Sequence, residues 1–393
     1  MDEYVKQELT ENASLKGNLD RIEIFTGERT TAPGAAQRIY GVPEIITIPV
    51  VVHVLYHTPD QNITQRTIDL LIGALNRDFN KRNFDTVNTP DRFKPYAAAM
   101  GFEFKLATMD PAGARTNGII KKYTPITYWM SDDKMKFSSS YGDDGWDSKS
   151  YLNIWVCNMR DVLGYSTLPG MDAAKDGIVL SFNDIINRRG TSPALNDFRT
   201  VVHEAGHWLN LYHMWGEGYC GDDKIDDTPK QSGYTPGCPG GVRISCGSNP
   251  VGDMYMNYMD FTDDVCMNMF TKGQSKRARV LFEPGGPRNS ILNSKGLNIT
   301  SEETATLPDF YPRWLQTKVY PNPATSFINL YFEYDDRWLG REMQILDISG
   351  KIVINKTINS RIQNIDVSRL SPGVYFIRAE KEEEKYHAKF VKL

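Results

Sequence analysis

The stretch that decides the fold is His203-Glu204-Ala205-Gly206-His207-Trp208-Leu209-Asn210-Leu211-Tyr212-His213, which holds three of the six histidines of the chain. On a helix, His203 and His207 are four residues apart and point the same way, so both imidazoles can reach one metal ion. Glu204 lies one step round the helix, where its carboxylate can hold a water molecule. His213 requires the chain to turn after His207, and Asn210 tolerates the left-handed conformation of such a turn. Three neutral nitrogens leave one tetrahedral position open, which is typical of a catalytic zinc site.

The composition around this stretch is that of an ordinary soluble protein. The 393 residues include 45 Lys and Arg against 49 Asp and Glu, a net charge of −4, and 40% are hydrophobic. Such a length predicts two to three domains. The chain has no basic block, which argues against nucleic acid as a main partner. It also has no apolar run long enough for a membrane span. Met1-Asp2-Glu3-Tyr4 does not open a signal peptide, so we expect either an internal protein or a sequence that begins after its signal.

The pattern along the chain predicts four regions. Residues 1–40 are polar, and we expect at most a short surface helix over residues 2–24, with apolar positions too sparse for a core. A β-branched strand at residues 45–55 and a helix that begins at Thr64 then open an alternating α/β segment with a mixed sheet. The regions are an N-terminal arm or pro-segment (1–40), a catalytic domain (41–300), a linker (301–317) and a C-terminal domain (318–393).

The C-terminal region is predicted to be all-β. Short apolar segments alternate with turn signals such as Pro321-Asn322-Pro323 and Ser371-Pro372-Gly373. Strands at this spacing indicate a small β-sandwich of roughly 75 residues. The five expected strands are residues 327–332, 343–346, 351–353, 374–379 and 386–391.

The histidine stretch resembles the extended motif of the metzincin metallopeptidases, His-Glu-x-x-His-x-x-Gly-x-x-His, with Asn210 in place of the usual glycine. That motif is followed by a methionine-containing turn, which corresponds to residues 257–261 with Met259 beneath the metal. Residues 164–169, together with the stretch through His213 to Asp264, resemble the pappalysin family in particular. The resemblance implies an α/β (α+β) metzincin catalytic domain with a mixed sheet, an active-site helix, a smaller lower subdomain and a cleft between the two.

The resemblance also carries expectations about substrate. An extended peptide would add as a strand to the sheet edge, for which residues 177–182 are the candidate, although they could equally form a plain core strand. Relatives often carry a tyrosine two residues after the methionine, where this chain has Phe261. Related pappalysins often prefer a basic residue after the scissile bond. Asp264 is our candidate for the base of that pocket, with Asp263 second; the alternative is that both are solvated.

Five cysteines bear on the compartment. Cys220, Cys238, Cys246 and Cys266 show no Cys-x-x-Cys pair, so a structural zinc site is disfavoured, and three disulfide pairings are open from sequence alone. The pappalysin resemblance implies Cys220–Cys246 and Cys238–Cys266. Disulfides indicate an oxidising compartment, and we therefore expect an exported protein. Cys157 follows a predicted strand and is expected to be a buried free thiol.

An acidic loop, Gly221-Asp222-Asp223-Lys224-Ile225-Asp226-Asp227-Thr228-Pro229, lies after the first of these cysteines. Oxygen-rich loops of this kind suit calcium, although a solvated acidic turn is the simpler alternative. Matching loops in pappalysins bind calcium. By resemblance the ligands would be the side chains of Asp223 and Thr228 with the backbone carbonyls of Asp222, Ile225 and Thr228.

The C-terminal region resembles the sorting domain of type IX secretion substrates. Three landmarks occur in order, at residues 319–324, 346–351 and 370–376. The resemblance implies export by the type IX machinery, followed by removal of the domain or anchoring at the cell surface. The alternative is an accessory immunoglobulin-like module that binds substrate or cell wall.

Together these features predict a secreted or cell-surface zinc endopeptidase that hydrolyses protein or peptide substrates with a metal-activated water, Glu204 being the base and His203, His207 and His213 the metal ligands. The alternatives are a non-catalytic adhesin on a metal-stabilised protease fold and a zinc hydrolase for other substrates. No cysteine precedes Cys157, so latency would depend on an upstream cysteine or on a carboxylate such as Asp2. The arm could be released at Arg29 or Arg38, both expected to be exposed.

Overall fold

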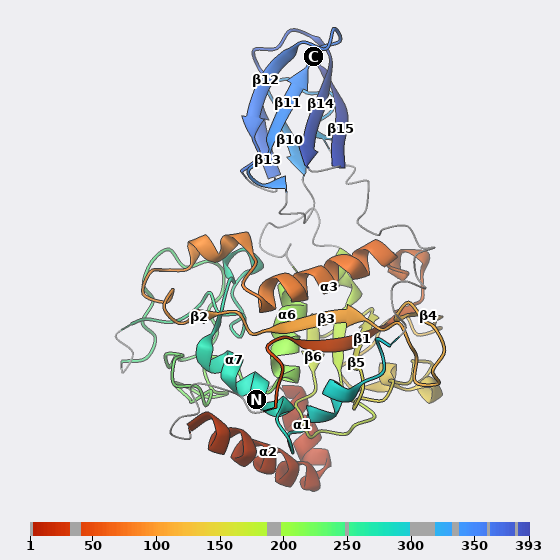
Figure 1. Cartoon of the computed structure of the whole chain (residues 1–393), viewed down its shortest axis with the longest axis vertical. Coiled ribbons are helices and arrows are strands. Elements are labelled where there is room, and N and C mark those ends of the chain that lie inside the picture. The colour runs from red at the N-terminus through yellow and green to blue at the C-terminus, as the bar shows by residue number, and fades with distance from the viewer. Residues whose placement is uncertain are drawn as a thin grey trace. The chain divides into compact units, whose positions relative to one another are not determined.

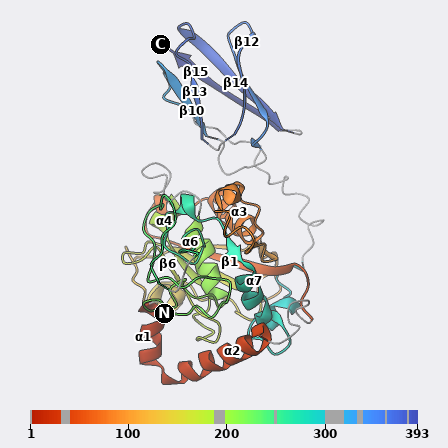
Figure 2. The same ribbon diagram turned by 90° about the vertical axis from the view of Figure 1, so that its left-hand side faces the viewer.

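The structure is a computed structural model that divides into two compact units, Met1–Thr300 and Ser301–Leu393. It describes residues 3–31, 41–186, 198–247, 251–298, 319–331, 338–359, 362–381 and 384–393 (Figures 1 and 2). The predicted linker, residues 301–317, lies outside the described residues, as do Asp2 and Arg38. Among the described residues, no helix combines the length and the apolar character that crossing a membrane requires.

The first unit is built on the predicted mixed sheet. Four parallel strands are followed by one antiparallel strand, and a further strand pairs in parallel with the second half of β1. The central strand β1 is almost entirely buried, because both faces of a parallel sheet are covered. In sheet order the strands are β3 (Phe102–Leu106), β1 (Ile46–Tyr56), β5 (Leu152–Cys157), β7 (Ile178–Ser181) and β6 (Gly164–Ser166), with β4 (Ile119–Tyr123) beside β1.

The strand that the sequence suggested for the edge of this sheet lies inside it. Strand β7 has β5 on one side and β6 on the other, so the expectation that residues 177–182 form an edge is wrong. Within the described residues, β6 has β7 as its one neighbour and forms one edge of the sheet, and β3 lies at the opposite end. Only three residues of β6 pair with β7, and so short a segment gives little alternation to read from sequence.

Two helices pack beside the sheet. Helix α3 (Gln65–Phe79) begins after Thr64, as predicted, where the Thr64 side chain accepts a hydrogen bond from the Thr67 N–H. Helix α6 (Arg199–Trp208) contacts α3, β6 and β7. The remaining elements are α4 (Phe182–Ile186), α7 (Lys272–Arg279), the pair β2 (Ala97–Ala98) and β8 (Phe270–Thr271), and 3-10 turns at Pro59–Gln61, Phe84–Asn88, Lys134–Lys136, Ser138–Ser140, Asp264–Cys266, Val280–Phe282 and Asn289–Asn293.

The N-terminal arm contributes to the core, contrary to expectation. It forms two helices, α1 (Glu3–Glu11) and α2 (Ala13–Thr31), which lie away from α3 in both views (Figures 1 and 2). Tyr4, Val5 and Leu15 are buried in a cluster with residues from further along the first unit, among them Trp155. Arg29 is not freely exposed, because it lies in α2 and pairs with Glu283 at 3.1 Å.

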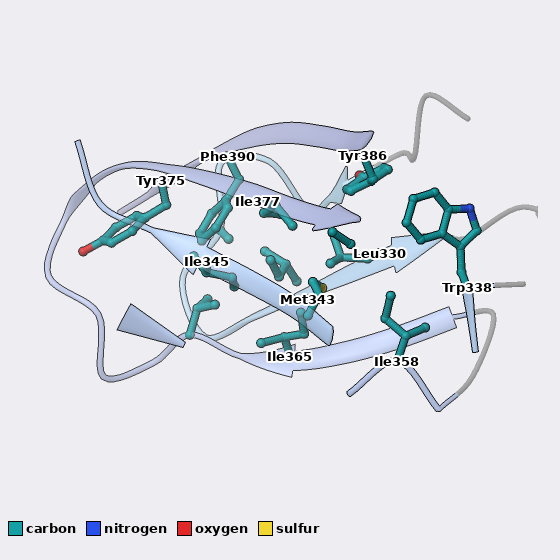
Figure 3. Packing of buried hydrophobic residues seen from close by; sticks show 14 residues of the cluster. Leu330, Trp338, Met343, Ile345, Ile358, Ile365, Tyr375, Ile377, Tyr386 and Phe390 are labelled. Carbon is teal, nitrogen blue, oxygen red and sulfur yellow. The ribbon is translucent and has the colours of Figure 1, made fainter. Parts of the chain in front are cut away.

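The second unit contains two antiparallel sheets that share one core (Figure 3). The five predicted strands are present, and β9 and β13 are additional. Leu330 and Ile365 from one sheet and Ile345, Ile377 and Phe390 from the other meet in this core. The sheets have the orders β13 (Ile362–Asp366), β10 (Phe327–Tyr331), β9 (Val319–Tyr320) and β12 (Ile352–Thr357), β11 (Glu342–Leu346), β14 (Gly373–Lys381), β15 (Glu384–Lys392).

Candidate active site

Helix α6 and the turn that follows it bring the three histidines together. His203 and His207 face the same way on α6, which ends at Trp208. Asn210 then adopts the left-handed conformation expected of it, with φ of 67°. The Leu211 N–H donates to the Gly206 carbonyl at 2.9 Å, so the chain folds back against the helix and returns His213 to the first two histidines.

The three histidines converge through the same ring atom. The Nε2 atom of His207 lies 3.0 Å from the Nε2 of His203 and 3.0 Å from that of His213, and the third Nε2–Nε2 distance is 3.3 Å. Nitrogens bound to one tetrahedral zinc at its usual bond length are roughly 3.3 Å apart. Within the described residues, this is the one group of three or more metal-binding side chains brought together in this way.

Hydrogen bonds from the opposite ring nitrogens favour one tautomer of His203 and of His207. The Nδ1 of His203 donates to the Tyr258 carbonyl at 2.7 Å, and the Nδ1 of His207 donates to the Leu211 carbonyl at 2.8 Å. The Nδ1 of His213 lies 2.7 Å from the Glu217 carboxylate. With the proton held on Nδ1, each Nε2 directs a lone pair at the common centre, which is the form that binds a metal ion.

Burial favours the neutral form of two of the three imidazoles. Burial lowers the pKa of His207 to about 4, although the hydrogen bond to the Leu211 carbonyl acts in the opposite direction and raises it. Burial also holds the pKa of His213 well below its ordinary value, with the neighbouring histidines adding to the effect. Neutral imidazoles are the ligand form, so no proton has to leave before a divalent cation binds near neutral pH. The donor set therefore fits a metal ion such as zinc.

Glu204 follows His203 on α6 and is buried, with 6% of its surface exposed. It faces the start of the edge strand. A Cβ placed on Gly164 would lie 3.2 Å from the Glu204 Cγ and 3.1 Å from the Val179 carbonyl. The missing side chain at Gly164 thus leaves room for the Glu204 carboxylate beside β6.

The predicted methionine turn lies under α6. Met259 is fully buried, and a methyl group on Gly206 would collide with its sulfur. The Met259 N–H donates to the Asn257 side chain at 3.0 Å, which closes the turn. Because Tyr258 accepts the His203 proton, this turn also orients a histidine.

A buried ionic network at the start of α6 was missed by the sequence analysis. The Arg199 guanidinium is fully buried, pairs with Asp78 and with Asp85 at 2.7 Å, and donates to the Tyr258 hydroxyl at 2.8 Å. The Arg199 N–H donates to Asp264 at 3.2 Å. Each partner lies far from Arg199 in the sequence. The one local indication was Asp78, a carboxylate next to Phe79 in the last turn of α3.

The candidate specificity residues differ in environment. Asp264 is buried at the first turn of α6, whereas Asp263 is half-exposed. Phe261, where relatives often carry tyrosine, is half-exposed, and its ring lies 4.8 Å from that of His213 and 5.2 Å from that of Trp215. The surface next to the histidines is therefore aromatic.

Two disulfides tie the lower part of the site. Cys220 pairs with Cys246 and Cys238 pairs with Cys266, with sequence separations of 26 and 28. This is the pairing that the resemblance implied. Cys157 is a buried free thiol, as predicted, and burial raises its pKa.

The carboxylates of the acidic loop lie in different environments. The Thr228 hydroxyl lies 2.8 Å from both oxygens of Asp223 and 2.8 Å from the Ile225 carbonyl. Burial raises the pKa of Asp223 to about 7. Asp222 is exposed, and Asp227 accepts the Gly273 N–H at the start of α7. A cavity of about 580 Å³ is lined by residues of this loop together with Met214, Lys230 and Val251.

Comparison with known proteins decides the family. A family model described as pregnancy-associated plasma protein-A matches residues 136–283. An extracellular metalloprotease of Arthroderma benhamiae is 31% identical over 237 residues, which cover 57% of this chain and 72% of the relative. The chain belongs to the pregnancy-associated plasma protein-A, or pappalysin, family of metallopeptidases.

Solved pappalysin-like structures extend the match. Mature mirolysin of Tannerella forsythia, solved with a cleaved peptide, is 43% identical with a TM-score of 0.61 and covers 63% of this chain and 96% of its own. A promirolysin mutant of the same organism is 39% identical with a TM-score of 0.66 and covers 73% of this chain and 94% of its own. The mixed α/β metalloprotease fold is therefore that of mirolysin.

The C-terminal unit is matched separately. A family model described as a secretion-system C-terminal sorting domain matches residues 318–393. With extracellular relatives and a sorting domain, this pappalysin is a metallopeptidase that is secreted or held at the cell surface.

Proposed function

We propose that the protein is a zinc-dependent endopeptidase in which His203, His207 and His213 hold the metal. The convergence of three Nε2 atoms, with the Nδ1 atoms of His203 and His207 hydrogen-bonded to backbone carbonyls, is the observation that supports this most strongly. A zinc ion bound there acts as a Lewis acid that polarises the scissile carbonyl and makes a bound water more acidic.

Glu204 is the proposed general base and acid. Its carboxylate takes a proton from the attacking water and delivers it to the amine that leaves when the peptide bond breaks. Its buried position beside Gly164 supports the role, because few water molecules compete there for the carboxylate. Phe261 has no hydroxyl, so its side chain would not donate a hydrogen bond to a developing oxyanion. A non-catalytic adhesin would have no chemical use for Glu204.

The substrate is proposed to bind as an extended strand along β6. In the part of the chain that the structure describes, this edge strand pairs with β7 alone, and its Gly164 lies beside Glu204, so an added strand would place its carbonyl groups beside the metal ligands. The proposed preference is for a basic residue just after the scissile bond, with Asp264 as its partner and Asp263 as the second candidate. The buried carboxylate of Asp264 at the start of the histidine-bearing helix supports this choice.

Removal and return of the metal test the function. Treatment with a strong chelator is expected to abolish cleavage of a peptide library, and stoichiometric zinc is expected to restore it, because the three Nε2 atoms already converge on one point before the metal binds. Cleavage is measured by mass spectrometry of the products. Full activity in chelated protein whose zinc content has been shown to be negligible would refute a metal-dependent mechanism.

Residues 1–40 are proposed to be a pro-segment. The promirolysin match covers about a tenth more of this chain than the mature mirolysin match, which corresponds to the length of the arm. Since Arg29 is held in α2, release just before Arg38 is the simpler route, and it agrees with the proposed preference for a basic residue after the cut.

The loop at residues 222–228 is proposed to bind calcium. One Thr228 proton cannot satisfy two carboxylate oxygens and a carbonyl at once, and a hard cation among these oxygens resolves the conflict. The side chains of Asp223 and Thr228 would be ligands, with the backbone carbonyls of Asp222, Ile225 and Thr228. A cation would also favour the ionised form of the buried Asp223.

Calcium is expected to raise the melting temperature. In protein made inactive by Glu204→Ala, calcium at 100 times its Kd should raise Tm by roughly 5 °C. Asp223→Asn should remove this response, whereas Asp226→Asn, an exposed carboxylate of the same loop, should keep it. The measurement is differential scanning calorimetry across a calcium titration, and a flat Tm in the parent protein would return the loop to a solvated turn.

The C-terminal unit is proposed to be an immunoglobulin-like sandwich that addresses the protein to the type IX machinery. Its two antiparallel sheets with one shared core support the architecture, and the sorting-domain match supports the role. We propose that it folds independently of the catalytic domain at residues 41–300, to which residues 301–317 link it.

A further inference from the structure

The turn after α6, residues 209–213, affects the position of more than one of the proposed metal ligands. It carries His213, and its Leu211 carbonyl accepts the Nδ1 proton of His207 at 2.8 Å. A displacement of this turn would therefore move His213 and rotate His207 at the same time. What holds the turn in place then matters for how tightly the metal is kept.

Arg277 of helix α7 holds the turn from behind. Its Nε donates to the Asn210 carbonyl at 2.7 Å, and its guanidinium is almost fully buried. Asn210 is the residue with positive φ, on which the reversal of the chain depends. The Arg277 guanidinium also lies 4.9 Å above the ring of Tyr212 in the same turn.

Glu23 of helix α2 completes this arrangement from the N-terminal arm. Its two carboxylate oxygens accept from Arg277 at 2.5 and 3.1 Å, and the Tyr212 hydroxyl donates to it at 3.3 Å. A bidentate pair fixes the plane of the guanidinium, and that plane sets the direction of the Nε–H aimed at Asn210.

A second contact lies one turn further along α2. The fully buried Thr26 hydroxyl accepts from the Asn210 side chain at 3.4 Å. Arm residues thus contact both the side chain of Asn210 and, through Arg277, its carbonyl.

We propose that helix α2 stabilises the metal-binding turn, with Glu23 as a positioning residue, so that the attached arm slows the loss of metal from the site. This inference rests on the proposed zinc site. When the arm is absent, Arg277 keeps its bond to Asn210 but loses the carboxylate that orients it, and the turn gains freedom. The protein with its arm attached is then expected to retain zinc better than the protein without it. It follows that zinc would bind before the arm is released.

The test compares zinc release from two arm variants in the inactive Glu204→Ala background, which prevents self-digestion. Glu23→Gln removes the charge that orients Arg277. Arg29→Gln is the matched control, because it breaks another ion pair between α2 and the domain, that with Glu283 at 3.1 Å, without touching the turn. The rate of zinc transfer to a chromogenic chelator and the visible spectrum of the cobalt-substituted protein are measured beside Tm.

Glu23→Gln is expected to release zinc about tenfold faster and to shift the cobalt spectrum, which is the effect of losing one charge-assisted interaction. Arg29→Gln should leave both unchanged. Equal release rates in the parent and Glu23→Gln, or equal acceleration in both variants, would overturn the role of Glu23. Failure of the parent protein to bind zinc would instead overturn the proposed function.

Discussion

Glu204→Ala is expected to abolish measurable peptide hydrolysis while leaving zinc content and Tm close to those of the wild type. In the proposed mechanism the carboxylate transfers protons, and it is not among the three converging ligands, so the metal site should survive its loss. Positioned acid–base catalysis accounts for about 10²–10⁴ in rate, and kcat/KM should fall at least that far. The measurement is turnover of a fluorogenic peptide together with zinc determination on the same sample.

The histidines supply the contrast. Alanine at His203, His207 or His213 should lose zinc as well as activity, since each provides one of the three Nε2 atoms. Glu204→Ala that retains zinc but also retains substantial turnover would refute the assignment of the base. Loss of zinc in Glu204→Ala would show that this residue supports the metal rather than the proton transfer.

The histidine-bearing helix could be predicted from sequence because its information is local. A spacing of four residues fixes two side chains on one face, and the left-handed conformation of Asn210 follows from a requirement to turn within six residues. Helix α3 was likewise predictable, since Thr64 and a 3.6-residue apolar period mark its beginning and its buried face.

Features that depend on partners far along the chain could not be predicted. Tyr4, Val5 and Leu15 are too few to indicate a core by themselves, and they are buried because Trp155 and its neighbours receive them. The order of β7 and β6 was misjudged for a similar reason. A sequence pattern shows that a strand is buried, but the last strand of a sheet is defined only by the absence of a further neighbour.

The network around Arg199 shows the same limit within the site. Its carboxylate partners Asp78 and Asp85 come from α3 and the segment after it, and no local rule pairs them with an arginine so far away in the sequence. The network fixes the start of α6 and, through the Tyr258 hydroxyl, the methionine turn. The histidine motif predicts the candidate ligands from sequence. The buried ion pairs that hold the start of the histidine-bearing helix can be identified only from the fold.

Asp264→Asn is expected to lower the preference for arginine over leucine after the scissile bond by about 10–100-fold in kcat/KM, the worth of a charge-assisted pair. Asparagine retains an oxygen that can accept the Arg199 N–H, which Asp264 now accepts at 3.2 Å, so α6 should keep its first turn. The measurement is a competition between two peptides that differ only at that position. Because it reports a ratio, it does not depend on the fraction of active enzyme.

The neighbouring carboxylate gives the matched control. Asp263 is half-exposed, and Asp263→Asn should leave the arginine preference within about twofold of the wild type, because water screens an exposed charge. A loss of preference in Asp263→Asn but not in Asp264→Asn would move the pocket to the second candidate. A wild type that cleaves before arginine and leucine equally well would remove the basic pocket altogether, and with it the reason to expect self-release of the arm before Arg38.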